Sequence, residues 1–189
     1  MKIEIISGSP RNSSVTRRVA LHLKNWLSQN TAHEVGMIDL KDWDIPFLQS
    51  VWVSQDKVPV EFQPLAERIF KADAYILVTP EYNGSYSPAL KNLFDHFPKR
   101  HHKAFGIVTA SPGAMGGIRA AQQMLQLVPA LFGISSPNLL VIPSVDKKFS
   151  PDGDLLDENF QNSVHNFITE FLWLAEKIVT PVVTPAVVA

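Results

Sequence analysis

The segment from Gly8 to Thr16 carries residue types that can hold a phosphate group. Four hydroxyl side chains, one amide and Arg11 stand there, immediately before a run with the apolar spacing of a helix. Free backbone N–H groups and the positive end of a helix dipole attract an anion, hydroxyls donate to its oxygens, and arginine adds charge. Ordinary helix capping by Ser13 or Ser14 explains the same composition. These residues taken alone leave both interpretations open.

The glycine content of this segment limits which phosphate it could hold. A dinucleotide site needs a G-x-G-x-x-G pattern, and a P-loop needs a closing Gly-Lys-Ser/Thr. Only Gly8 is present here. Side-chain donors in place of glycines favour a terminal phosphomonoester, as in a mononucleotide.

A second polar segment, from Thr79 to Asn92, suits a flat heteroaromatic ring. Pro80 starts a turn, and Tyr82 offers an aromatic face. Asn83 offers an amide donor and acceptor, and the next residue is a glycine that permits close backbone approach. A half-buried packing role is the alternative for Tyr82 considered alone.

Three segments together resemble the NADPH-dependent FMN reductase family, the flavodoxin-like reductases of quinones, azo dyes, chromate and free flavin. They are Gly8-Ser9-Pro10-Arg11, Pro80-Glu81-Tyr82-Asn83 and a glycine-rich run from Ser111 to Arg119. The segments follow one another in the family's order. The resemblance is good from Met1 to about Ala120, and beyond that point only the pattern of helices and strands matches.

The resemblance implies a bound FMN, with NADPH or NADH as co-substrate. One set of residues would hold the phosphate, a second would lie along the isoalloxazine ring, and a third would meet its pyrimidine edge. In this sequence the sets are Ser9, Arg11, Ser14, Val15 and Thr16; Pro80, Glu81, Tyr82 and Asn83; and Ser111, Pro112 and Gly113. The glycine-rich run agrees, because backbone N–H groups at a helix start stabilise negative charge on a flavin. A flexible turn is the alternative for those glycines.

No side chain is expected to act as a catalytic acid or base. Glu81 is a lone carboxylate, and a structural role in its loop or at a subunit interface is the stronger interpretation. Asp39 has no glycine fingerprint before it and is expected to be a turn residue. The basic run 99–103 has adjacent histidines but no carboxylate at ligand spacing, which predicts a solvated turn and no metal site.

Hydrophobic patterning places these segments on an alternating α/β chain. Short apolar runs predict strands at 3–6, 35–40, 74–79, 105–109 and 139–142, and helical periodicity predicts helices at 14–27, 60–72, 88–97, 117–132 and 157–178. Strands spaced in this way cannot pair through hairpins, so we expect a parallel sheet with helices on both faces. The resemblance adds a flavodoxin-like, doubly wound, five-stranded sheet in the order 2-1-3-4-5. Ligands of such sheets bind beyond the carboxyl ends of the strands, where all three segments lie.

Length and composition limit the domain organisation and the partners. The chain has 189 residues, 46% of them hydrophobic, no cysteine and a formal net charge of −1. We expect one flavodoxin-like domain over 1–180, an apolar extended tail over 181–189 lying on this subunit or a neighbour, and a functional or mobile loop over 42–59. The near-neutral charge argues against nucleic-acid and membrane partners. The lack of cysteine and of a signal peptide predicts a cytoplasmic protein, and the resemblance implies a homodimer or homotetramer.

The sequence therefore predicts an FMN-dependent oxidoreductase that takes a hydride from NAD(P)H and passes it to a small-molecule electron acceptor. A flavodoxin-type electron carrier without nucleotide turnover is the alternative, although flavodoxins are usually strongly acidic and this chain is not. A non-enzymatic sensor of flavin or nucleotide is a third possibility.

Overall fold

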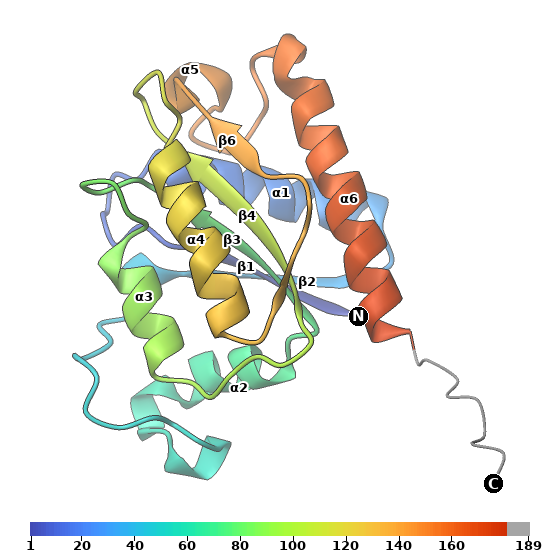
Figure 1. Cartoon of the computed structure of the whole chain (residues 1–189). Helices are drawn as coiled ribbons and strands as arrows, with labels where there is room; N and C mark the ends of the chain where they lie inside the picture. Colours follow the sequence, from blue (N-terminus) through green and yellow to red (C-terminus); the bar gives the residue numbers. More distant parts are fainter. Residues whose placement is uncertain (181–189) are drawn as a thin grey trace, which may run out of the picture.

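A computed structural model describes residues 1–180, and the predicted tail at 181–189 lies outside the described residues (Figure 1). The strands are β1 (Lys2–Ser7), β2 (Glu34–Asp39), β3 (Ala74–Thr79), β4 (Ala104–Ala110), β5 (Ile134–Ser135) and β6 (Leu140–Ile142). The helices are α1 (Thr16–Asn30), α2 (Gln63–Lys71), α3 (Pro88–Asp95), α4 (Ile118–Ala130), α5 (Val145–Lys148) and α6 (Gln161–Val179). Single turns of 3-10 helix lie at Leu40–Asp42, Gln55–Lys57, Val60–Phe62 and Glu158–Phe160.

The strands form one parallel sheet in the order β2-β1-β3-β4-β5, and β6 also pairs with β4. Every residue of β3 and β4 is buried, as expected for central strands whose two faces are both covered. The predicted flavodoxin-like fold and strand order are confirmed.

Helices cover both faces of the sheet (Figure 1). α1 and α6 pack on one face, over a core that includes Ile3 and Ile5 of β1. α2, α3 and α4 pack on the other, over a core that includes Ile6. This alternation follows the two-residue period of a strand. Within residues 1–180, no helix has both the length and the apolar character needed to cross a membrane.

Two short elements were not predicted, namely β5 and α5. A two-residue strand and a four-residue helix are too short to show a hydrophobic period, so tertiary packing decides them. At Gly133, just before β5, an added Cβ would lie 2.3 Å from the ring of Phe105. The chain therefore reaches β4 only because a glycine lets it pass that ring.

One sequence prediction about a polar residue is wrong, and a second is only partly right. Asp39 is not a turn residue: it ends β2, is 7% exposed and accepts a hydrogen bond from Arg17. The run 99–103 is only partly a solvated turn, because Arg100 is 9% exposed. Its guanidinium donates to the Ile69 carbonyl at 3.3 Å and lies 5.3 Å from the centre of the Phe70 ring. The charge pattern of the sequence does not show that Asp39 and Arg100 are buried beside these partners.

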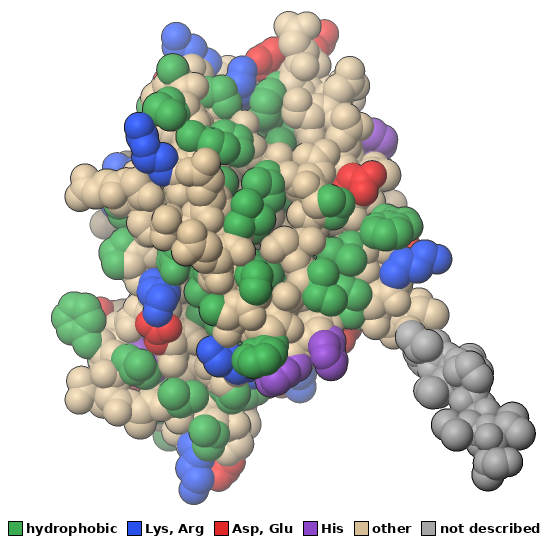
Figure 2. All heavy atoms as spheres, in the orientation of Figure 1, with side chains coloured by type: hydrophobic (Ala, Val, Ile, Leu, Met, Phe, Trp, Pro, Cys, Tyr) green, Lys and Arg blue, Asp and Glu red, His purple; other side chains and the backbone are tan. Residues whose placement is uncertain are grey.

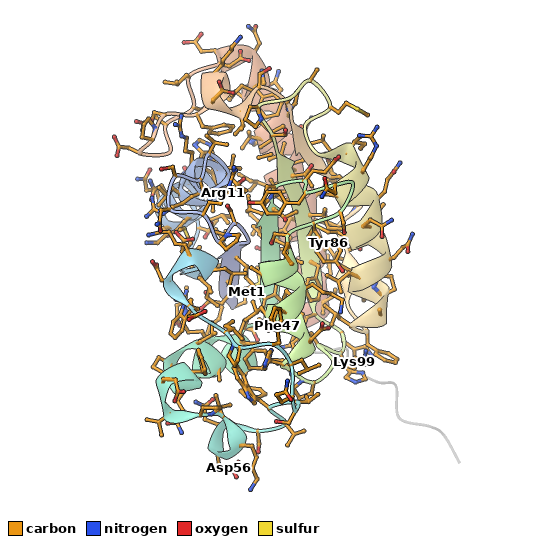
Figure 3. All side chains as sticks on the ribbon, turned by 90° about the vertical axis from the view of Figure 1, so that its left-hand side faces the viewer. Met1, Arg11, Phe47, Asp56, Tyr86 and Lys99 are labelled. Carbon is orange, nitrogen blue, oxygen red and sulfur yellow. The ribbon has the colours of Figure 1, made fainter. Side chains whose placement is uncertain are left out.

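The long loop over 42–59 is anchored at Trp52. This side chain is 4% exposed, and its ring centre lies 4.4 Å from that of His96 and 5.2 Å from that of Phe62. The backbone N–H of Trp52 donates to the His96 carbonyl at 2.7 Å. Phe47 of the same loop is 88% exposed and stands out on the side that faces the viewer in Figure 3.

Candidate functional site

The three predicted segments meet at the carboxyl edge of the sheet, as parallel topology requires. Gly8, after β1, donates its N–H to the Val78 carbonyl of β3 at 2.8 Å. Ser87 closes the loop after β3: its N–H donates to Thr79 Oγ1 at 3.0 Å, and its hydroxyl donates to the Gly8 carbonyl. The first two segments are therefore held together by buried hydrogen bonds.

The predicted phosphate loop ends at a helix start that has free N–H groups. Val15, at the N-cap position of α1, makes no capping side-chain bond, and the first turn contains no acidic residue. Ser14 Oγ accepts the N–H of Arg17 at 3.3 Å, so this serine does part of a cap's work. Arg11 is exposed, and a hollow of about 360 Å³ lies against the helix start. Its lining residues are Asn12, Ser13, Ser14, Val15, Arg17, Arg18 and Pro151.

The second loop forms a tight two-residue turn. Tyr82 and Ser85 exchange backbone hydrogen bonds of 2.9 and 3.1 Å. The residues between them, Asn83 and Gly84, have φ values of 51° and 84°, which is the backbone of a type I′ turn. The Arg11 guanidinium lies 5.6 Å from the centre of the Tyr82 ring, so the structure brings these two predicted site residues together.

The glycine-rich loop lies against Thr109, near the carboxyl end of β4. Gly117 has a φ of 89°, and an added Cβ there would lie 2.9 Å from Thr109 Cβ. Ser111 Oγ accepts the Gly113 N–H at 3.0 Å. Any side chain at Gly117 would force this loop off the strand, so glycine determines how closely it approaches.

Glu81 connects the second and third loops. Its carboxylate accepts the Arg119 backbone N–H at 3.2 Å and the Arg119 guanidinium at 3.4 Å, at the start of α4. These bonds agree with the structural role preferred for this acid. A contact between Glu81 and a cofactor stays a prediction, as it does for the other site residues.

Four hydroxyl oxygens near this edge are buried and have no hydrogen-bond partner among the described residues. They belong to Ser7, Thr16, Tyr82 and Thr109. Buried hydroxyls without a partner are costly, and a polar ligand above them would supply one. The donor set fits a phosphorylated aromatic group. Among residues 1–180, no group of three His, Cys, Asp or Glu side chains could hold a metal ion.

Sequence reasoning missed part of this polar set. Ser7, Thr109 and Arg119 were not singled out, and Asp39 was misassigned. A polar residue near the end of an otherwise apolar strand was the available signal for Ser7 and Thr109.

Two further hollows, of about 300 and 330 Å³, share His22, Trp26 and Leu155 and contain no residue of the three segments.

The fold and the site define a flavodoxin-like α/β protein whose polar loops converge beyond the carboxyl ends of parallel strands. The chain belongs to the NADPH-dependent FMN reductase family, whose sequence profile matches residues 1–146. An FMN-dependent NADPH-azoreductase from Staphylococcus haemolyticus (strain JCSC1435) is 30% identical over 183 residues, covering 91% of this chain and 94% of that protein. Membership of the family makes the protein an oxidoreductase, with FMN and NADPH as its cofactors.

Solved structures agree on the fold. FerB, a flavoenzyme NAD(P)H:(acceptor) oxidoreductase from Paracoccus denitrificans, superposes with a TM-score of 0.78 at 22% identity, covering 93% of this chain and 97% of that one. A mutant of flavodoxin from Pseudomonas aeruginosa has a TM-score of 0.59 at 17% identity, covering 93% and 99%. At these identities the likenesses establish the flavodoxin-like fold alone.

Proposed function

We propose that this protein uses NADPH, through bound FMN, to reduce a small acceptor such as an azo compound or a quinone. The observation that carries the proposal is a set of four buried hydroxyls beneath three converging loops, which have no hydrogen-bond partner within residues 1–180. The names of the related azoreductases favour an azo compound as the first acceptor to test.

We assign the phosphate of FMN to the start of α1. Ser9, Ser14 and Thr16 would donate hydroxyls, Val15 its backbone N–H, and Arg11 its charge. Two observations support this assignment: the Arg11 side chain is exposed, and the buried Thr16 hydroxyl has no partner in the described part of the chain.

We assign the flavin ring to the space between the second and third loops. Pro80, Glu81, Tyr82 and Asn83 would flank it, and Ser111, Pro112 and Gly113 would meet its pyrimidine edge. The buried hydroxyls of Tyr82 and Thr109, which lack partners among the described residues, support this assignment.

FMN supplies the redox chemistry when bound, because it accepts two electrons from NADPH and gives them to the acceptor. The protein holds the ring and leaves one face accessible. Little bulk stands at Gly84: an added Cβ would meet only the Arg119 side chain, at 3.8 Å. A low rim allows a nicotinamide to stack within the ~3–3.5 Å that transfer requires.

Anaerobic bleaching of the flavin tests the proposal. We expect NADPH to bleach the FMN-loaded protein, and an azo dye or a quinone to restore the colour, with one quinone reduced for each NADPH consumed. NADH in a parallel titration gives the nucleotide preference. If neither nucleotide bleaches the flavin, the electron-carrier interpretation replaces this one.

We also propose self-association, as a homodimer or homotetramer. Apolar side chains gather on the face shown in Figure 2, over α4 and between α4 and α6. Exposed apolar side chains on or directly after these two helices include Leu125, Phe132, Ile134 and Trp173, and exposed apolar patches commonly mark interfaces. Light scattering that gives the 21.0 kDa monomer mass at micromolar concentration would reject this proposal.

A further inference from the structure

Asp39 lies directly beside the strand that leads into the predicted phosphate loop. It is the last residue of β2, and its register partner across the parallel pair is Ser7, the last residue of β1. β2 is the edge strand of the sheet, and Arg17 of α1 reaches over it. The Asp39 carboxylate therefore lies next to the predicted phosphate loop, although Asp39 belongs to none of the three matched segments.

The contact between Asp39 and Arg17 is short and uses only one of the two carboxylate oxygens. Asp39 Oδ2 accepts from Arg17 Nε at 2.7 Å, and the carboxylate side chain is only 6% exposed while that of Arg17 is 37% exposed. Asp39 Oδ1 and the neighbouring Ser7 hydroxyl are buried without a partner among residues 1–180. A buried carboxylate that is half satisfied is a poor source of stability.

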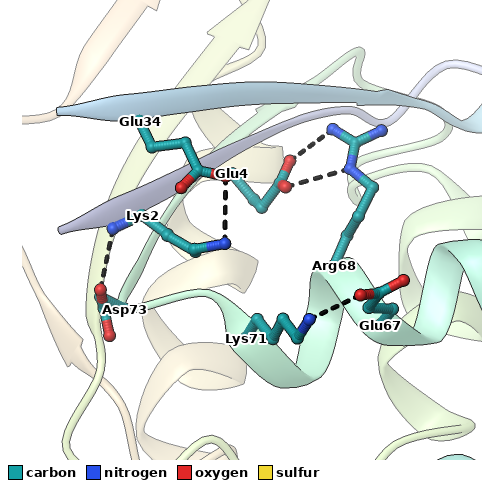
Figure 4. A network of polar contacts seen from close by, with 7 residues as sticks. All are labelled: Lys2, Glu4, Glu34, Glu67, Arg68, Lys71 and Asp73. Carbon is teal, nitrogen blue, oxygen red and sulfur yellow. Dashed lines mark hydrogen bonds and ion pairs between the residues drawn. The ribbon is translucent and has the colours of Figure 1, made fainter.

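A second carboxylate–arginine pair, between Glu4 of β1 and Arg68 of α2, shows what a well-satisfied arrangement looks like (Figure 4). Glu4 of β1, 8% exposed, accepts from Arg68 Nε at 3.0 Å and from Arg68 Nη2 at 2.6 Å. Both carboxylate oxygens are used, in the bidentate form that gives the strongest pairs. The two carboxylates are buried to nearly the same extent. A contribution to folding stability therefore explains the fully hydrogen-bonded Glu4 pair better than it explains the half-satisfied Asp39 pair.

Arg17 connects Asp39 to the start of α1. While its side chain is held by Asp39, its backbone N–H donates to Ser14 Oγ at 3.3 Å, inside the predicted phosphate loop. The N-cap residue Val15 supplies no capping bond. Ser14 thus caps one N–H of the helix start, and the ion pair fixes where that start lies relative to the sheet.

From these contacts we infer that Asp39 is a positioning residue for the phosphate of FMN. It holds Arg17, and through Arg17 it places Ser14, Val15 and Thr16 so that their N–H and hydroxyl groups converge on the phosphate. Asp39 also neutralises the charge of Arg17, so Arg11 is the arginine that contacts the phosphate. This inference rests on the proposed position of the phosphate at the start of α1.

The test compares FMN with riboflavin, which has the same ring and no phosphate. Dissociation constants are measured by flavin fluorescence on the apoprotein for wild type, Asp39→Asn, Arg17→Gln and the double variant. We expect Asp39→Asn to weaken FMN about tenfold, the typical loss for one charged hydrogen bond, and riboflavin by less than about twofold. The double variant should be no weaker than Asp39→Asn, because both changes break the same connection.

Glu4→Gln is the matched control, since it weakens an equally buried carboxylate–arginine pair far from the phosphate loop. We expect it to lower the melting temperature and to leave the ratio of FMN to riboflavin affinity unchanged. The inference is overturned if Asp39→Asn leaves that ratio unchanged, if Glu4→Gln changes it equally, or if the Asp39 and Arg17 effects add. A wild-type protein that binds riboflavin as tightly as FMN would overturn the phosphate site itself, together with this inference.

Discussion

The hydroxyl and guanidinium groups at the carboxyl edge of the sheet differ in how deeply they are buried. Thr16 and Thr109 are fully buried and lack a hydrogen-bond partner in the described part of the chain, whereas Arg11 is exposed and lies over the Tyr82 ring. Buried hydroxyls are preorganised, and an exposed arginine loses side-chain entropy when it binds. The arginine is the group whose removal should change affinity with the least effect on folding.

Arg11→Ala should weaken FMN binding by about 1.5–3 kcal/mol, the usual contribution of a hydrogen bond to a charged group. Stability should change by less than about 0.5 kcal/mol, because the side chain is exposed. Fluorescence titration gives the affinity, and titration with riboflavin serves as the control. An unchanged FMN dissociation constant would remove Arg11 from the site.

Among the secondary-structure elements, two loops are each tied to a helix in part through one residue. Glu81 ties the loop after β3 to α4, and Trp52 ties the long loop over 42–59 to the end of α3. Both ties join segments that are distant in sequence, so their removal should have separable effects.

Glu81→Ala should loosen the second and third loops together, because each loses the contact with the other. We expect faster hydrogen–deuterium exchange over 80–87 and over 111–119. Glu67→Ala, which removes an exposed ion pair with Lys71 on α2, is the control and should leave both segments unchanged. Equal exchange in wild type and Glu81→Ala would mean that the loops are held by other contacts.

Trp52→Ala should destabilise the fold by about 3–5 kcal/mol, because a buried ring packed on His96 and Phe62 is replaced by a cavity. Phe47→Ala, in the same loop, should cost less than about 0.5 kcal/mol because that ring is exposed. Urea unfolding measures both free energies. Similar losses for the two variants would show that the loop is not anchored at Trp52.

For the whole molecule, the contact between α1 and the chain that leads to α6 should make stability depend on pH. His22 Nδ1 donates to the Gly153 carbonyl at 2.9 Å. Burial lowers the pKa of His22 below its ordinary value of 6.5, and the bond to Gly153 and the charge of Asp154 oppose this only in part. The unfolded chain therefore takes up this proton at a higher pH than the folded chain does.

The stabilisation linked to His22 is fully present above about pH 6.5 and is lost as the pH falls through the lower, folded-state pKa. Wild type should lose more unfolding free energy than His22→Gln between about pH 7.5 and about pH 5.5. Urea titrations of both proteins at the two pH values measure this difference. If wild type and His22→Gln lose the same unfolding free energy, the pH dependence arises from the other histidines.

Residue patterning alone was enough to predict the architecture and to select the three loops that form the candidate site. Apolar runs separated by helical periods leave only a parallel sheet covered on both faces, and its topology brings the loops after β1, β3 and β4 to one edge. Gly84 was expected to permit a close backbone approach, and the positive φ that it has is one that glycine adopts at little cost. These features depend on local residue types and their spacing.

Which polar groups pair with one another is visible only in the folded chain. Asp39 with Arg17, Glu81 with Arg119 and Arg100 with Ile69 join residues 22 to 38 positions apart, and no periodic pattern signals such partners. The same holds for β5, which is a strand only because Gly133 lets the chain pass the Phe105 ring and reach β4. Contacts between distant segments depend on packing geometry, and one-dimensional patterning does not contain that geometry.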